Sequence, residues 1–126
     1  MSIESIKVKL SKLETLGGPM ELEAVERVLN ERIRQVEEEG YTPAHDDENR
    51  RSGELAAAGA CYLLAVHHQN VAYVRTGSML VKPSSPHPAW PFPRVIWRPA
   101  SPTRMTVKGT ALGLADLVRH LRAGLL

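Results

Sequence analysis

Proline is distributed very unevenly along this chain. Seven of its nine prolines lie within residues 77–102. Because proline lacks a backbone N–H and clashes with the preceding turn, this segment cannot form a regular helix. It also contains Trp90, Phe92 and Trp97, whose burial offsets the entropy lost when a loop becomes ordered. We therefore expect a long, ordered Pro/Trp-rich loop that covers a core built by the rest of the chain.

Elsewhere, apolar residues recur three and four positions apart, which is the spacing of amphipathic helices. The sequence predicts an all-α fold, a small bundle of about four helices with the long loop before the last one. The expected helices cover about residues 1–16, 19–39, 48 or 52 to 70, and 101 or 103 to 123. The third helix is rich in Gly and Ala, so we expect it at the centre of the bundle. Residues 71–74 fit either its continuation or a short extended piece.

The N-terminal helix stands apart from the others. The sequence Gly-Gly-Pro at residues 17–19 ends it, because glycine accepts the C-cap conformation and proline cannot continue the helix. We expect residues 1–18 to be an amphipathic helix that contacts another copy in a homo-oligomer. Residues 19–126 are expected to form a single helical domain.

The second helix offers two faces. Its expected buried stripe consists of Leu22, Val25, Leu29, Ile33 and Val36. Arg27, Glu31, Arg34 and Glu38 share another face. The favoured interpretation of this second face is a solvated surface with ion pairs. The alternative is a pair of arginines directed at a phosphate or carboxylate.

A polar corner, residues 41–47, follows the second helix. Pro43 disfavours the helical conformation at Thr42, and Asp46 or Asp47 is expected to start the next helix by accepting backbone N–H groups. His45 beside these carboxylates is a metal ligand, an acid/base group or a hydrogen-bonded structural histidine, and the last is the commonest. We expect no metal site, because no regular ligand spacing is present. The single cysteine, residue 61, excludes an internal disulfide and is expected to be a small buried apolar residue.

Charge is divided between the two halves of the sequence. Residues 1–54 hold thirteen acids and eight bases, net −5, whereas residues 55–126 hold one acid and eight bases, net +7. Such a basic half indicates an anionic ligand or an acidic protein surface, unless the halves neutralise each other on folding. No apolar run is long enough for a membrane span and no secretory signal is present, so we expect no membrane partner and a cytoplasmic location. Scattered bases without a recognition motif argue against DNA or RNA as a partner.

Several motifs resemble a widespread family of small phage and prophage accessory proteins. They are ERIRQ (31–35), EGYTPAHDD (39–47), GELAAA (53–58), CY (61–62), WPF (90–92), IWRP (96–99) and RMTVKGTAL (104–112). The similarity covers about residues 28–115 and departs at Tyr41 and Phe92, where that family tends to tryptophan. The expected architecture is also similar to ryanodine-receptor repeat modules, which is an analogy of fold alone.

The resemblance implies a phage-borne protein that acts on host defence in the cytoplasm of an infected bacterium. One form of this role is a sponge that sequesters a small nucleotide immune signal. A sponge needs no catalytic residue, cofactor or metal; it needs cations for phosphates and aromatic faces for bases. The candidate ligand-binding residues are Arg32, Arg34, Arg104 and Lys108 for phosphates, Trp90 and Trp97 for stacking, His45 and Asp46 for ribose or base, and Tyr41.

Two alternatives remain open. The GEL run after an ER-x-RQ helix resembles MazG-like pyrophosphohydrolases, helical enzymes that hold Mg²⁺ with paired acidic motifs. The resemblance implies that the carboxylates in that role would be those of Glu31, Glu38, Asp46, Asp47 and Glu54. Here GELAAAG lacks the second acid and the last helix offers only Asp116, so this activity is expected to be degenerate. The third hypothesis is an inhibitor that binds a host protein through the basic half or the Pro/Trp segment.

Overall fold

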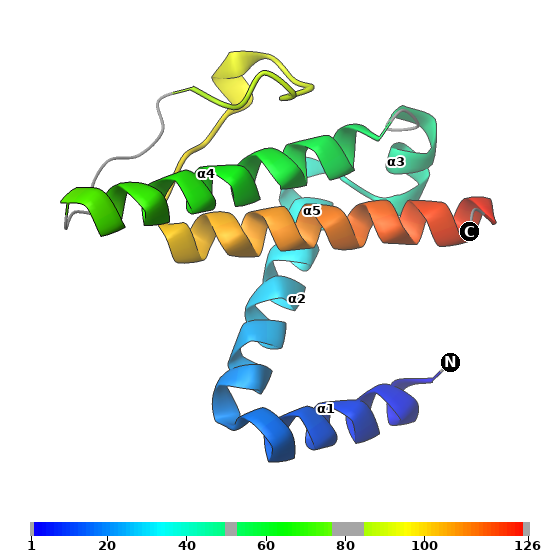
Figure 1. Ribbon diagram of the computed structural model, residues 1–126. Coiled ribbons are helices and arrows are strands. Elements are labelled where there is room, and N and C mark those ends of the chain that lie inside the picture. The colour runs from blue at the N-terminus through cyan, green and yellow to red at the C-terminus, as the bar shows by residue number, and fades with distance from the viewer. Residues whose placement is uncertain (1, 50–52, 77–84, 125–126) are drawn as a thin grey trace.

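The computed structural model describes residues 2–49, 53–76 and 85–124, and within these ranges it is all-α. The elements are α1 (Ile3–Gly17), α2 (Pro19–Glu39), α3 (Pro43–Asn49), α4 (Glu54–Thr76), the 3₁₀ helix η1 (Arg94–Ile96) and α5 (Pro102–Ala123). The predicted fold class is confirmed (Figure 1). None of the helices in the described ranges is long and apolar enough to cross a membrane.

Helices α4 and α5 lie side by side and form the centre of the molecule (Figure 1). They approach most closely at Gly59 and Gly109, where a Cβ on either glycine would lie 2.7–2.8 Å from the carbonyl oxygen of the other. The small residues of α4 therefore have the central role that the sequence predicts. Nine side chains form the apolar core: Leu55, Ala58, Cys61, Tyr62, Ala65, Trp97, Met105, Leu112 and Ala115.

The polar corner differs from the prediction, because residues 43–49 form a helix of their own. Thr42 caps α3, and its Oγ1 accepts the His45 backbone N–H at 3.1 Å. Asp46 and Asp47 thus lie inside α3 and do not start the next helix. The physical reason is Pro43, which is tolerated in the first turn of a helix and favours the extended conformation that a capping residue needs. Helix α4 starts after this turn and continues through residues 71–74 to Thr76.

The predicted apolar stripe of α2 is wrong at two positions. Leu29 and Ile33 are 48 % and 53 % exposed, whereas Glu31 and Gln35 are each only 2 % exposed. The face of α2 that is buried in the molecule is therefore polar. Periodicity alone cannot show this, because an ion pair can replace apolar contacts where two helices meet.

Helix α1 extends from the rest of the molecule. It lies at the end of α2 that is far from α4, and among the described helices it contacts only α2 (Figure 1). None of its residues is buried.

Residues 85–101, which we call the cover, lie against α4. The Trp97 ring is 6 % exposed and stacks on Tyr62 with 4.7 Å between ring centroids. Trp90 meets both rings edge-on, at 5.6 Å from Tyr62 and 5.1 Å from Trp97. The Arg98 backbone N–H donates to the Tyr62 hydroxyl at 3.4 Å. The predicted ordered loop is present over this range, and its first part, residues 77–84, lies outside the described residues.

Candidate functional site

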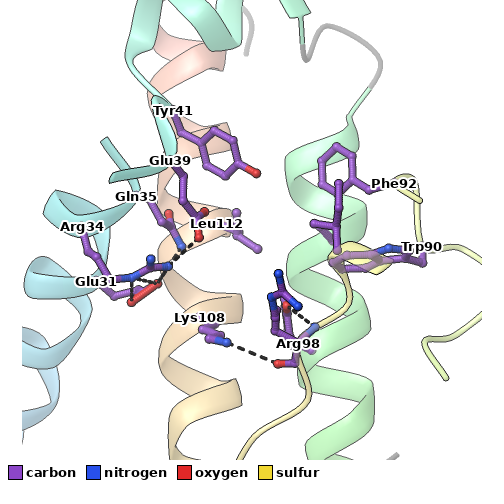
Figure 2. A pocket seen from close by; sticks show the side chains of 13 residues that line it. Glu31, Arg34, Gln35, Glu39, Tyr41, Trp90, Phe92, Arg98, Lys108 and Leu112 are labelled. Carbon is purple, nitrogen blue, oxygen red and sulfur yellow. Dashed lines mark hydrogen bonds and ion pairs between the residues drawn. The ribbon is translucent and has the colours of Figure 1, made fainter. Parts of the chain in front are cut away.

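A cavity of about 260 Å³ lies between the C-terminal half of α2, the α4–α5 pair and the cover. Figure 2 shows α2 on one side, and Trp90 and Phe92 of the cover on the other. The lining residues are Glu31, Arg34, Gln35, Glu39, Tyr41, Ala58, Tyr62, Trp90, Phe92, Ile96, Arg98, Lys108 and Leu112. The cavity is thus built from four segments that are far apart in the sequence.

One wall of the cavity is aromatic. Trp90 and Phe92 meet edge to face at 5.5 Å, and Trp90 meets Tyr62 in the same way. The Trp90 Nε1–H donates to the Pro93 carbonyl at 3.3 Å, which holds the indole in place. Tyr41 lines the cavity from the α2–α3 turn (Figure 2). Aromatic rings held in this way offer apolar surface to a ligand without further ordering.

The opposite wall contains a buried ion-pair network. Glu31 accepts three hydrogen bonds from Arg34, Nη2–Oε2 at 2.8 Å, Nε–Oε1 at 2.9 Å and Nε–Oε2 at 3.2 Å, and a further one from Arg104 Nη2 of α5. Burial by itself would raise the pKa of Glu31, but the hydrogen bonds from the two arginines outweigh it and lower the pKa. Arg34 also donates to Glu39 at 2.9 Å. The hydrogen bonds to Glu31 are the main reason that the pKa of Arg34 is raised.

The favoured interpretation of this α2 face as solvated is therefore wrong for Glu31. The carboxylate lies at the α2–α5 contact, where Arg104 approaches it from the other helix. Arg27 does form a surface pair, although its partner is Glu23 on the preceding turn. Residue spacing predicts ion pairs within α2, but it does not show that Arg104 of α5 approaches Glu31.

Lys108 of α5 faces the cavity with few partners. Its Nζ donates to the Arg98 carbonyl at 3.3 Å and lies 5.6 Å from the centre of the Tyr62 ring (Figure 2). Burial, and to a smaller extent the charge of Arg104, lower the pKa of this ammonium group. An ammonium has three N–H donors, so the carbonyl leaves hydrogen-bonding capacity for a ligand.

Two further polar groups complete the lining. The Gln35 Oε1 is buried, and within the described residues it has no hydrogen-bond partner. A buried acceptor without a partner costs about 1–3 kcal/mol, and a donor on a ligand would remove this cost. Arg98 contributes a guanidinium at the edge of the cavity, where its own carbonyl holds Lys108.

The nine residues predicted to bind a ligand are divided by the structure. Four of them line the cavity: Arg34, Tyr41, Trp90 and Lys108. Arg104 lies behind the wall and contacts it through Glu31.

Two of the predicted residues hold Tyr41 in place. Arg32 donates from Nη1 to the Tyr41 carbonyl at 2.9 Å, and the His45 ring stacks on the Tyr41 ring at 5.8 Å. His45 Nδ1 lies 3.2 Å from Asp46 Oδ1, and Asp46 is almost completely buried. Arg32, His45 and Asp46 are not among the lining residues, and their contacts make them supports of the cavity wall.

Trp97 is the remaining predicted residue, and it belongs to the core. Its stacking partner is Tyr62, so that ring face is not available to a ligand. Several lining residues are outside the nine predicted ones, among them Gln35, Tyr62 and Phe92. Arg98 also lines the cavity, and its position directly after Trp97 in the aromatic loop is the sequence signal that makes it a candidate to flank an aromatic wall.

The chain matches no protein-family model, no curated protein and no solved structure. Its function therefore has to be argued from the chemistry of the cavity. Within residues 2–49, 53–76 and 85–124, three or more His, Cys, Asp or Glu side chains do not gather into a group that could hold a metal ion.

Proposed function

We propose that this protein binds a small ligand that combines one aromatic ring with an anionic group, and that a nucleotide with a single base is the class that fits best. The observation that carries the proposal is Lys108. Its ammonium is partly desolvated, faces the cavity and has one carbonyl as hydrogen-bond acceptor among the described residues. An anion placed beside it would restore the electrostatic stabilisation that burial removes.

The charge around the cavity supports an anionic ligand. Three cations, Arg34, Arg98 and Lys108, line it together with the two carboxylates of Glu31 and Glu39, which leaves a formal charge of +1. Arg104 adds a positive charge behind the wall, and both Arg34 and Arg104 are bonded to carboxylates. Among the described residues, the cations that line the cavity without an ion-pair partner are therefore Lys108 and Arg98.

The size of the cavity and its aromatic wall support a ligand with a single ring. Ligand sites typically enclose about 300–1,000 Å³, so a cavity of about 260 Å³ lies just below that range. A base lying against Trp90 and Tyr41 would gain about 1–3 kcal/mol from stacking. Gln35 Oε1, as an acceptor without a partner among the described residues, suits an exocyclic amine of a base.

We further propose that the protein is phage-borne and that it sequesters a nucleotide immune signal in an infected bacterium. Sequestration requires affinity and no reaction. The acid at the centre of the site, Glu31, is occupied by two arginines. This engagement favours binding over the pyrophosphohydrolase alternative, which would need that carboxylate for Mg²⁺.

Isothermal titration tests the proposal with a panel of nucleoside monophosphates, cyclic mononucleotides, cyclic dinucleotides and ADP-ribose. We expect micromolar or tighter binding of a member with one base, and weaker binding of the larger dinucleotides. Lys108→Met should weaken that binding at least about tenfold, which corresponds to about 1.4 kcal/mol. Chromatography of the ligand after incubation with Mg²⁺ should recover it unchanged.

Arg122→Met is the matched control, because Arg122 is a cation on the same helix whose contact is Asp47, outside the cavity. The Arg122→Met variant should bind the ligand with the same affinity as the wild type. Absence of heat with every member of the panel at millimolar ligand would reject nucleotide binding. Equal losses in both variants would show that long-range charge attracts the ligand and that the cavity does not hold it.

A further inference from the structure

Much apolar surface remains exposed at the N-terminal end of the molecule. Many of the exposed large apolar side chains belong to α1 and α2: Ile3, Ile6, Val8, Leu13, Leu16, Met20, Leu29 and Ile33.

Part of this surface is a groove of about 870 Å³ between the N-terminal half of α2 and α5. Apolar side chains dominate the α2 side, including Val25 and Val28, whereas the α5 side combines three threonines with Pro102, Val107 and Leu114. The α5 side runs from residue 102 to residue 114, which corresponds to a length of about 18 Å. Soluble monomers rarely leave a continuous apolar surface of this kind uncovered.

Helix α1 has an apolar face that, within the described residues, does not pack into a groove of its own chain. Helix α1 spans 15 residues, so it is about 22 Å long and matches the groove in length. It has no buried residue, and among the described helices it contacts only α2. Its apolar side chains recur at the three- and four-residue spacing of a packing face.

We propose that the occupant of the groove is α1 of a second copy of this chain, and that the two copies exchange these helices in a symmetric dimer. In a two-fold dimer the same surface acts on both subunits, so each α1 must find its receptor on the partner. This chain supplies both halves of the contact, the apolar helix and the apolar groove.

The charges beside the two surfaces are complementary. Helix α1 carries three lysines and two glutamates, net +1, whereas residues 19–29 of α2 carry three glutamates and one arginine, net −2. Glu23 lines the groove and pairs with Arg27 at 2.9 Å. The acids of this stretch that have no ion pair among the described residues are Glu21 and Glu26, so the lysines of an incoming α1 would meet opposite charge there, which favours this occupant over an acidic helix from another protein.

Sedimentation equilibrium of the full chain tests the proposal. We expect a species of twice the 13.9 kDa chain mass at tens of micromolar protein. The double substitution I6E and L13E in α1 should raise the dimer dissociation constant at least about 30-fold, because charge in the centre of an interface costs as much as the loss of a hot spot. T106E on the α5 side of the groove should act in the same way, and its side chain is exposed in the single chain, so folding is preserved.

The control is V95E, which places the same charge on an apolar residue that is 78 % exposed and belongs to the cover. It should leave the dissociation constant unchanged. If the chain stays monomeric at about 100 µM, a concentration at which a specific dimer should form, the proposal is overturned. The groove would then be left to a different protein. A dimer that resists both interface variants also overturns it.

Disulfide cross-linking between introduced cysteines tests where α1 lies in the dimer. Chains with Leu13→Cys are mixed with chains that carry Thr103→Cys or Thr110→Cys in the groove, and are oxidised; the native Cys61 is buried and does not compete. A disulfide between the two kinds of chain places α1 in the groove of its partner. Disulfides only between two Leu13→Cys chains would show that the α1 helices pack on each other, and would overturn the groove assignment.

Discussion

Glu31 is the residue on which the polar side of the cavity depends. It is 2 % exposed and joins two helices, since Arg34 comes from α2 and Arg104 from α5. Four hydrogen bonds from the two arginines compensate the cost of burying its charge. An apolar side chain at this position would pack the helices together, but it would leave both arginines without their shared carboxylate.

We predict that Glu31→Gln lowers the free energy of unfolding by about 2–4 kcal/mol, because a buried ion pair then loses one partner while the others stay charged. The loss is below the upper limit for such pairs, since Arg34 and Arg104 can turn toward water. Chemical denaturation at pH 7 measures it. Glu23→Gln is the matched control, as it removes the acid of an exposed pair with Arg27 and should cost less than about 1 kcal/mol.

The loss of stability caused by Glu31→Gln should depend on pH. The pKa of Glu31 is lowered in the folded protein, so its stabilising contribution is complete above the unfolded value of about 4.3 and is lost as pH falls through the lowered pKa. The difference in stability between wild type and Glu31→Gln should therefore shrink below about pH 4. A difference that stays constant down to pH 2 would show that packing, and not charge, is what the carboxylate contributes.

At the scale of elements, the contact between α4 and α5 determines where the cavity lies. Gly59 and Gly109 allow the two backbones to touch, and this contact brings Tyr62 and Lys108 to the same side of the helix pair. The helix ends are set by local chemistry. Ser101 caps α5 by accepting the Arg104 N–H at 3.2 Å, and Gly40 ends α2 with a φ of 73°, which a residue with a side chain rarely adopts.

We predict that Gly109→Ala destabilises the protein by about 2–4 kcal/mol, because the new Cβ would lie 2.8 Å from the Gly59 carbonyl and the helices must separate. Gly113→Ala, one turn further along α5, has no neighbour within 4 Å and should stabilise by about 0.5–1 kcal/mol through helix propensity. Thermal unfolding of both variants gives the comparison. Equal effects of the two substitutions would contradict the close approach of α4 and α5.

At the scale of the whole molecule, the cover and the helices form one core. Trp97 is inserted among side chains of α4 and α5, and its stacking on Tyr62 helps to hold the cover over the cavity. Trp90, which lines the cavity with Phe92, packs edge-on against both of these rings. Stability and the shape of the site are thus coupled through Trp97.

We predict that Trp97→Ala lowers the free energy of unfolding by about 3–5 kcal/mol, as expected for a large buried aromatic side chain. The variant should also lose the ligand found by titration, since the cover no longer holds Trp90 over the cavity. Val95→Ala changes an exposed residue of the same segment and should alter stability by less than about 0.5 kcal/mol. A Trp97→Ala protein with wild-type stability would contradict an anchored cover.

The sequence by itself determined the all-α fold, the approximate ends of the main helices, the small-residue centre of the bundle and the ordered Pro/Trp loop. These features depend on spacing, on glycine and proline, and on composition, which are all local in the chain. Of the nine predicted binding residues, four line the cavity: Arg34, Tyr41, Trp90 and Lys108.

Only the tertiary structure decided the rest, because it depends on which residues meet across helices. Arg104 approaches Glu31 over a separation of 73 residues and makes the buried face of α2 polar, against the apolar pattern of that helix. Tyr62 covers one face of Trp97, and the His45 ring stacks on Tyr41. Burial and pairing are properties of these contacts, and residue spacing along one helix does not contain them.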